Sequence, residues 1–337
     1  MNNNVEEKFE IPVLFIIFNR LDTTKKVFEA IKEIKPTKLY IASDGPRTEK
    51  EFLKVQAVRD YVTSECDWQC TLKTRFRIEN LGAGFGVNDA IHWFFENEDA
   101  GIILEHDCLP SKSFFYFCKE LLIKYENNKQ IGVIQGFNPF PQSRLEASYF
   151  FSKYDLKWGW ATWRDRWQNQ DMFTKDWADI KKRKILNKIF LNNRLEVSYW
   201  YHIFDIIHRN PYITWDTQFT YKLLLNNMLT IVPSKNIVIN IGYGPEAYST
   251  KWGVPEHIKK LNLEKLYPPY IHPTEIKIDK DYDSLVERVH FEINIKTVFI
   301  RMLRNILESN AISRNLVLPL LVGIYRFYKY MRLKLGK

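Results

Sequence analysis

Cysteine is scarce in this sequence, and so are the spacings that would give it a structural role. Only four cysteines occur among the 337 residues, at Cys66, Cys70, Cys108 and Cys118. None forms a CxxC motif, and no set of Cys and His has the spacing of a zinc site. The sequence therefore argues against a structural zinc site and predicts reduced thiols inside a cell.

Long apolar runs are missing as well. A membrane-spanning helix needs about 18–20 apolar residues, and the longest candidate, residues 316–325, is shorter and contains Pro319. Residues 1–10 are polar and lack the apolar stretch of a signal peptide. We therefore expect a cytoplasmic protein with no membrane-spanning helix.

Several catalytic signatures are also absent. The glycines at Gly82, Gly84 and Gly86 are not followed by Lys and Ser or Thr, which excludes a P-loop, and they do not match GxGxxG. No nucleophile elbow with Ser, His and Asp is present. We expect residues 82–86 to form a flexible loop, with direct phosphate binding as the alternative.

Positive charge is concentrated at the C-terminus. The net charge is +9, and residues 296–337 hold nine Lys or Arg against the single acid Glu308, so the rest is close to neutral. In the rest of the chain, Lys and Arg are too scattered to form the basic stripe of a nucleic-acid-binding protein. Drawn as a helix, residues 324–337 separate apolar from basic side chains, as interfacial helices do. We expect residues 291–337 to bind an anionic membrane surface and no nucleic acid. The alternative is a helix docked on the body.

Strands and helices alternate in the part of the chain before residue 140. Apolar runs predict strands at residues 13–18, 39–43, 70–78, 101–104 and 131–136, and helical patterns lie between them at residues 22–35, 49–64, 87–97 and 111–126. This alternation predicts an α/β fold with a doubly wound, mostly parallel, Rossmann-like sheet. The hydrophobic content of 45% provides for a sizeable core.

The composition changes after residue 140. Five of the ten tryptophans fall within residues 158–177, followed by helical patterns at residues 175–191, 196–209 and 215–227 and short strands at residues 230–232 and 237–241. We expect this half to be a lobe over the sheet edge, with most tryptophans in the core. Trp158 and Trp160, which flank Gly159, are the candidates for stacking on a sugar, because aromatic rings offer large flat surfaces.

The chain is organised around residues 101–110, where a buried strand runs into Glu105, His106 and Asp107. Ligands of open α/β sheets bind at the carboxyl edge of the strands, and Mg²⁺ or Mn²⁺ is often held by one or two carboxylates plus substrate phosphates. Arg20 and Asp44 follow the first two predicted strands and would share this edge. The alternative is ordinary solvated loop charge.

The order of these motifs resembles that of GT-A glycosyltransferases, in particular the branch of N-acetylglucosaminyltransferase I and its bacterial relatives. The motifs are Phe18-Asn19-Arg20, Ser43-Asp44-Gly45 and Leu104-Glu105-His106-Asp107, with Phe114-Phe115 behind them. The resemblance covers roughly residues 11–250. It implies a nucleotide-sugar-binding half at residues 11–140 and an acceptor-side half at residues 141–290, between a polar segment at residues 1–10 and the basic tail at residues 291–337.

The resemblance also implies site residues. Asp107 matches the acid that holds Mn²⁺ or Mg²⁺ on the donor diphosphate, and the nucleotide would be held by Arg20, Asp44, Glu105 and His106. The sugar and acceptor pocket would contain Trp158, Gly159, Trp160 and Trp215, and Asp216 would be the catalytic base of an inverting reaction. The family usually has Glu-Asp-Asp where this sequence has Glu105-His106-Asp107, although His is itself a competent Mn²⁺ ligand.

The implied function is a hexosyltransferase that uses a nucleoside-diphosphate sugar, with UDP-sugars favoured, and a glycan or lipid-linked acceptor. The expected setting is assembly of bacterial cell-envelope polysaccharide on the inner face of the plasma membrane. Two other functions stay open: a non-catalytic nucleotide-sugar-binding module and a nucleotidyltransferase. The second would need a Gly-rich basic loop after the first strand, which residues 18–22 do not supply. Asp216 could also be a helix cap alone.

Overall fold

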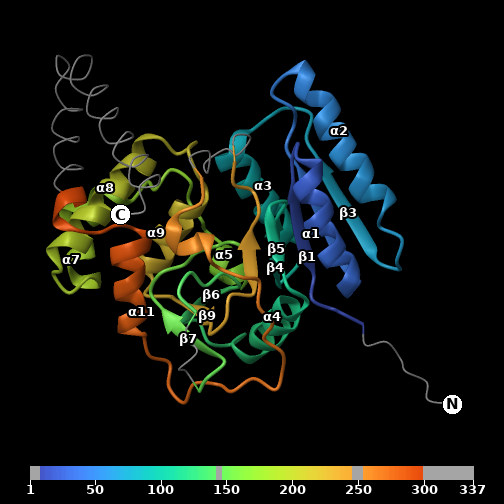
Figure 1. The fold of residues 1–337 in the computed structure, drawn as a ribbon. Helices are drawn as coiled ribbons and strands as arrows, with labels where there is room; N and C mark the ends of the chain where they lie inside the picture. The colour runs from blue at the N-terminus through green and yellow to red at the C-terminus, as the bar shows by residue number, and fades with distance from the viewer. Residues whose placement is uncertain (1–7, 142–145, 245–252, 299–337) are drawn as a thin grey trace.

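An eight-stranded sheet forms the centre of the computed structural model, which describes residues 8–141, 146–244 and 253–298 (Figure 1). In spatial order the strands are β3 (Thr71–Phe76), β2 (Lys38–Ser43), β1 (Val13–Ile17), β4 (Ala100–Glu105), β8 (Trp160–Trp163), β6 (Ile131–Gln135), β9 (Leu229–Pro233) and β7 (Tyr149–Ser152). All pairs from β3 to β4 are parallel, and so is the pair of β6 and β9. Strand β8 is antiparallel to both its neighbours, and β7 is antiparallel to β9. The predicted mostly parallel sheet is confirmed.

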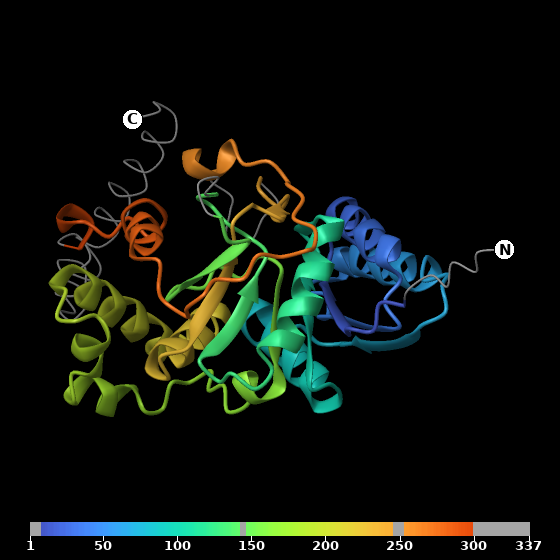
Figure 2. The ribbon, with the colours of Figure 1, turned by 90° about the horizontal axis from the view of Figure 1, so that it is seen from below.

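Helices cover both faces of this sheet, as a doubly wound fold requires (Figure 2). One apolar core lies between the sheet and α1 (Leu21–Ile34), α2 (Glu49–Ser64) and α4 (Lys112–Lys124). The opposite core contains α3 (Gly82–Asn97), α5 (Arg164–Trp167) and α9 (Asp216–Leu225). Strand β1 shows why both faces are filled: Phe15 lies in the first core and Leu14 in the second, because successive side chains of a strand point to opposite faces.

A third apolar cluster forms a helical lobe beside β7. It contains α6 (Trp177–Lys182), α7 (Ile185–Ile189), α8 (Arg194–Arg209), α11 (Lys280–Leu285) and the π-helical turn η1 (Val286–His290). The short helix α10 (Glu256–Lys259) follows the last strands. A small second sheet pairs β5 (Cys108–Pro110) with β10 (Val238–Asn240) in antiparallel register. Strand β5 thus fixes the backbone directly after Asp107.

The glycine-rich stretch was predicted as a loop, and this prediction is wrong, because residues 82–86 form the first turns of α3. The Asp44 carboxylate stabilises this helix start by accepting the backbone N–H of Leu81 and of Gly82, each at 2.9 Å. Glycine is needed here for close approach: a Cβ at Gly84 would lie 2.6 Å from the carbonyl oxygen of Tyr212, and one at Gly86 would lie 2.9 Å from Asp44 Oδ2.

Three other expectations need correction. The first helix spans Leu21–Ile34, so it begins and ends one residue before the predicted range of 22–35. Residues 175–191 form two helices, since Lys184 adopts a left-handed conformation (φ 53°) between α6 and α7. The second half of the chain is not only a lobe over the sheet edge, because β7, β8 and β9 belong to the sheet itself.

The predicted tail, residues 291–337, lies mostly outside the described residues, because residues 299–337 are not among them. Within the described ranges, no helix combines the length and apolarity that crossing a bilayer requires.

Arg166 joins α5 to the end of α4 and makes a testable contribution to stability. Its side chain is 2% exposed, and its Nη2 donates to the carbonyl oxygens of Tyr125, Glu126 and Asn128 at 3.1, 2.6 and 3.2 Å. These carbonyls lie at and beyond the C-terminal end of α4, where helix carbonyls have no partner within the helix. The guanidinium also lies over the Trp163 ring, 4.3 Å from its centroid.

We expect Arg166→Met to lower the free energy of unfolding by about 3–5 kcal/mol, because it removes a buried charge from its partners and leaves three carbonyls, among them that of the buried Tyr125, without this donor. Urea denaturation measures this. Arg183→Met, which changes an exposed arginine, is the control and should stay within about 0.5 kcal/mol of the parent. Equal stability of both variants would contradict the role given to Arg166.

Candidate functional site

A cavity of about 920 Å³ lies at the carboxyl edge of β1, β2 and β4. Eight of the ten predicted site residues contribute to its lining: Arg20, Asp44, Glu105, His106, Asp107, Trp158, Trp215 and Asp216. They come from positions up to 196 residues apart in the sequence, and the sheet brings them together because parallel strands end at one edge. The volume is at the upper end of the usual range for small-molecule sites.

Gly159 and Trp160 do not contribute to the lining. Trp160 is 1% exposed, so the prediction that it is a surface residue is wrong. Its ring stacks on Trp215 with centroids 5.6 Å apart and therefore supports the cavity wall from behind. Gly159 has φ +63° and, as a glycine, has no side chain to place in the cavity. Trp158 faces the cavity, and its ring packs on that of Phe137 with centroids 4.3 Å apart.

The end of β4 and the turn into β5 hold the predicted metal ligand. The Asp107 carboxylate lies against Gly242, where a Cβ would come within 2.1 Å of Oδ2. Arg20 Nη1 donates to the carbonyl oxygen of the same Gly242 at 2.8 Å, and Arg20 Nε is buried without a partner among the described residues. Gly242 thus makes room for an acid and anchors a guanidinium next to it, and Arg20 keeps a free N–H group in the site.

The acids of the cavity repel one another. Burial, and then the charges of Asp107 and Asp216, raise the pKa of Glu105 to about 8. Burial also lowers the pKa of His106, an effect that Asp107 opposes. A cation bound beside Asp107 would offset this repulsion.

The acids near Asp107 give a divalent cation only part of its ligand shell. Among the described residues, no three His, Cys, Asp or Glu side chains form a group that could enclose one. Asp107, with Glu105 close by, instead supplies the one or two carboxylates that Mg²⁺ needs when substrate phosphates and water complete its shell. The site therefore fits a cation shared with a diphosphate and does not fit a metal held by protein ligands alone.

The other end of the cavity contains charged residues that were not predicted from the sequence. Arg75 on β3 and Arg77 just after that strand both form paired hydrogen bonds with the carboxylate of Asp89 on α3, at 2.5–3.0 Å. All three contribute to the lining, next to Asp44. The spacing of two residues between the arginines was the available signal, because it places both on one face of a strand.

Asp216 is the first residue of α9 and is exposed to the cavity. Its Oδ1 accepts the backbone N–H of Thr217 at 2.7 Å and the hydroxyl of Thr214. No hydrogen-bond donor to Oδ2 lies among the described residues. One oxygen is therefore held in place by the helix start, while the other can accept a proton from a ligand in the cavity.

A buried ion pair next to Asp216 was also not predicted from the sequence. Lys157 is 4% exposed and Asp155 1%; their side chains contact each other, and Lys157 Nζ donates to Thr220 Oγ1 at 3.1 Å. Thr220 Oγ1 donates to Asp155 Oδ1 at 2.8 Å and to the carbonyl oxygen of Asp216 at 3.2 Å. Burial lowers the pKa of Lys157 to about 8, and the charge of Asp216 opposes this shift. The pair thus ties the β7–β8 loop to the first turn of α9.

Comparisons with known proteins give partial structural similarity only. No protein-family model matches the sequence, and no curated protein matches it. A solved structure that is similar in part is the mannosyltransferase PcManGT from Pyrobaculum calidifontis in complex with GDP-Man and Mn²⁺, with a TM-score of 0.32, 13% identity and coverage of 47% of this chain and 46% of that one. This chain thus spans about half of that protein.

Two structures of HddC from Yersinia pseudotuberculosis are similar to about the same extent. One has a TM-score of 0.29 and 9% identity over 46% of this chain and 77% of HddC, and the complex with GMP-PN has a TM-score of 0.26 and 10% identity over 42% and 60%. None of these descriptions refers to the N-acetylglucosaminyltransferase I branch that the motifs resemble.

The contact between Gly242 and Asp107 generates a prediction. Gly242→Ala should displace the Asp107 carboxylate, and we expect the affinity for Mn²⁺ with a nucleoside diphosphate to fall about 10–100-fold, as is common when a group that orients a metal ligand is changed. Calorimetry measures the affinity, and thermal melting checks that the fold is kept. Parental affinity would show that Asp107 does not need its present position.

Proposed function

We propose that this protein is a glycosyltransferase that moves a sugar from a nucleoside-diphosphate sugar, with UDP-sugars favoured, to a hydroxyl group of a glycan or lipid-linked acceptor. The observation that carries the proposal is the shared cavity: Arg20 and Asp107 face the place for a diphosphate, and Asp216 with one free carboxylate oxygen faces the same space. The proposed setting is the assembly of bacterial cell-envelope polysaccharide.

The proposed reaction is a direct, inverting displacement. The acceptor hydroxyl attacks the sugar carbon, Asp216 takes the hydroxyl proton on Oδ2, and the bond from the sugar to the diphosphate breaks. A divalent cation held by Asp107, with Glu105 nearby, would neutralise charge on the departing diphosphate. Arg20 donates hydrogen bonds to the diphosphate from the end of β1.

Lys157 has a proposed positioning role in this reaction. The charged groups that face it are Asp155 from its own loop and Asp216 at the start of α9, and the rings of Trp215 and Phe219 lie 5.9 and 5.8 Å from its Nζ. A positive charge here stabilises the ionised Asp216 carboxylate. Through Thr220, the same ion pair also holds the helix start that carries this carboxylate.

A screen of nucleoside diphosphates by thermal shift, with and without Mn²⁺, tests the donor class. A ligand that binds the folded state raises the melting temperature by mass action. We expect one diphosphate to stabilise the parent more strongly with Mn²⁺ than without it. Asp107→Asn should remove this difference and keep the fold, whereas His106→Asp should keep or raise activity. An Asp107→Asn variant with unchanged metal-linked affinity would overturn the metal assignment.

Asp216→Asn separates an enzyme from a binding module. The amide oxygen of Asn can still accept the backbone N–H of Thr217, so we expect a melting temperature within a few degrees of the parent and normal binding of the nucleoside diphosphate. Transfer should fall by a factor of about 10²–10⁴, because Asn cannot accept the proton. Asp171→Asn is the matched control, since Asp171 also accepts backbone N–H groups, from Phe173 and Lys175, but outside the cavity lining. Near-parental transfer by Asp216→Asn would leave Asp216 as a cap.

The pH dependence tests the role of Lys157. Because its pKa is lowered to about 8, Lys157 loses its charge as the pH rises through that value, and kcat/KM should fall with it. Lys157→Arg should move this fall in kcat/KM to higher pH, because Arg stays protonated. Lys157→Met should lower kcat/KM at every pH measured. Burial also lowers the pKa of Lys222 to about 8, but that side chain is outside the cavity lining. If Lys222→Arg instead moved the fall in kcat/KM to higher pH, its assignment to Lys157 would be wrong.

A further inference from the structure

One segment of the described body carries an unusual concentration of positive charge. Residues 180–195, which include the end of α6, all of α7 and the start of α8, contain six Lys or Arg and no Asp or Glu. We refer to residues 180–195 as the basic hairpin. Residues 1–295 have a net charge of +1, so the remainder of that part carries a net charge of −5. The near-neutral body therefore hides a strong separation of charge.

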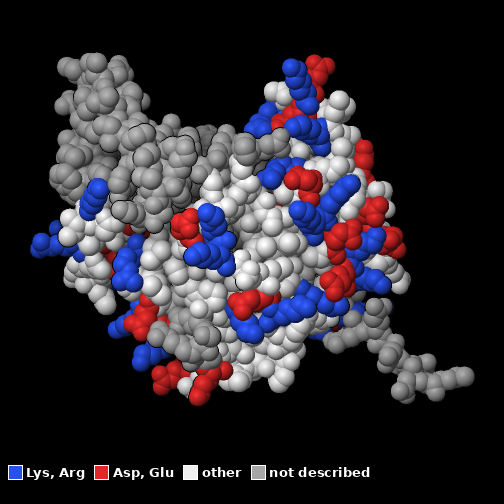
Figure 3. All heavy atoms as spheres, viewed as in Figure 1, with Lys and Arg blue, Asp and Glu red and all other residues white. Residues whose placement is uncertain are grey.

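Most of these cations form no ion pair within the part of the chain that the structure describes. Lys181 forms an ion pair with Asp205 at 2.8 Å. The other five are exposed, and none has a carboxylate within ion-pairing distance among the described residues: Lys182, Arg183, Lys184, Lys188 and Arg194. Lys and Arg side chains occupy the rim of the molecule where α7 lies (Figure 3). Unpaired cations gathered at one edge attract an anionic surface.

The hairpin is anchored, and its tip is apolar. Leu186 and Phe190 are 0% and 3% exposed and pack in the helical lobe, so the backbone between the cations is held in place. Leu191 and Asn192 both have positive φ, 47° and 62°, which turns the chain sharply. This turn leaves the Leu191 side chain 85% exposed between Lys188 and Arg194. An apolar side chain surrounded by cations is the composition of a membrane-surface site.

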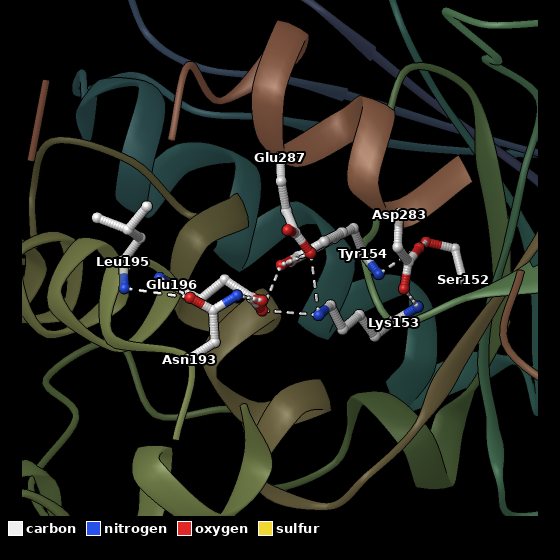
Figure 4. A network of polar contacts seen from close by, with 8 residues as sticks. All are labelled: Ser152, Lys153, Tyr154, Asn193, Leu195, Glu196, Asp283 and Glu287. Carbon is white, nitrogen blue, oxygen red and sulfur yellow. Dashed lines mark hydrogen bonds and ion pairs between the residues drawn. The ribbon is translucent and has the colours of Figure 1, made fainter. Parts of the chain in front are cut away.

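The described chain ends in the lobe that carries the basic hairpin. In the network of Figure 4, Lys153 Nζ lies 2.7 Å from Glu196 on α8 and 3.0 Å from Glu287 on η1, and the Tyr154 hydroxyl donates to both carboxylates. These contacts fasten η1 to α8. The described chain ends at Val298 in the same apolar cluster as Leu186. Residues 299–337, with eight Lys or Arg and one Glu, therefore continue from the lobe that carries the basic hairpin.

We propose that the basic hairpin is a docking surface for an anionic lipid membrane. The five unpaired cations contact lipid headgroups, and Leu191 enters the boundary between headgroups and acyl chains. A nucleic acid fits less well, because binding of single strands relies on exposed aromatic rings, and Phe190, the one aromatic residue of the hairpin, is buried. Docking places the helical lobe against the membrane.

Sedimentation of the full chain with vesicles tests this proposal. We expect the parent to bind phosphatidylcholine–phosphatidylglycerol vesicles at low ionic strength and to leave pure phosphatidylcholine vesicles unbound. Changing Lys182, Arg183, Lys184 and Lys188 together to Gln should lower the partition coefficient about tenfold or more, since each cation near an anionic surface contributes to binding. Leu191→Ser should weaken binding by a smaller factor.

A matched control removes the same charge elsewhere. Lys38, Lys112, Lys129 and Lys259 each form an ion pair outside the hairpin, with Glu98, Glu33, Asp165 and Glu256. Changing these four to Gln should leave vesicle binding close to the parental value. Equal binding by both quadruple variants would overturn the proposal, because net charge or the tail alone would then account for it. Binding of the parent to a single-stranded oligonucleotide but not to vesicles would also overturn it.

Discussion

Burial of Glu105 beside other carboxylates in one cavity is the constraint on which the rest of the site depends. Glu105 ends β4, Asp107 lies just after it and Asp216 begins α9, yet burial, and then the charges of Asp107 and Asp216, raise the pKa of Glu105 to about 8. The carboxylates of Asp107 and Asp216 repel a free diphosphate placed beside them unless positive charge lies close by. Arg20 and Lys157 supply part of that charge from the chain, and the proposed cation would supply the rest.

The mixed sheet is what brings the necessary loops to this cavity. Strand β8 is antiparallel between β4 and β6, and Trp160 at its beginning pairs with Ile103 near the end of β4. The loop that precedes β8 therefore lies at the carboxyl edge of the parallel strands, where it places Asp155, Lys157 and Trp158. A fully parallel sheet would have put the start of that strand at the opposite edge.

The same geometry shows what could be predicted from the sequence. Strands β1, β2 and β4 are uninterrupted apolar runs that stop at polar residues, so both the strands and the clustering of Arg20, Asp44 and Asp107 could be predicted. The antiparallel strands β7 and β8 could not, because their aromatic residues are also typical of a buried helix. Local sequence also failed at residues 82–86, where Asp44, 38 residues before Gly82, stabilises the helix start.

Contacts between residues far apart in the sequence also limited what could be predicted about the site. Lys157 and Thr220 are 63 residues apart, and the pair with Asp155 has no recognisable motif. Trp160 was misjudged for a related reason: a tryptophan beside glycine looks accessible in sequence, but its burial depends on Trp215 and on its place in the sheet. A residue whose role depends on one distant partner could not be identified from the sequence, whereas residues at the ends of apolar strands could.

The His106 position determines how the proposed cation and the diphosphate depend on each other. Burial lowers the pKa of His106, so this side chain is neutral where the resembling family has an acid, and the cavity holds one negative charge fewer. A cation alone is then held less strongly by the protein, and a diphosphate alone still meets the carboxylates of Asp107 and Asp216. Binding of either ligand therefore raises the affinity for the other, and this coupling is reciprocal by thermodynamic necessity. Under the proposed function, nucleotide and metal therefore bind as a pair.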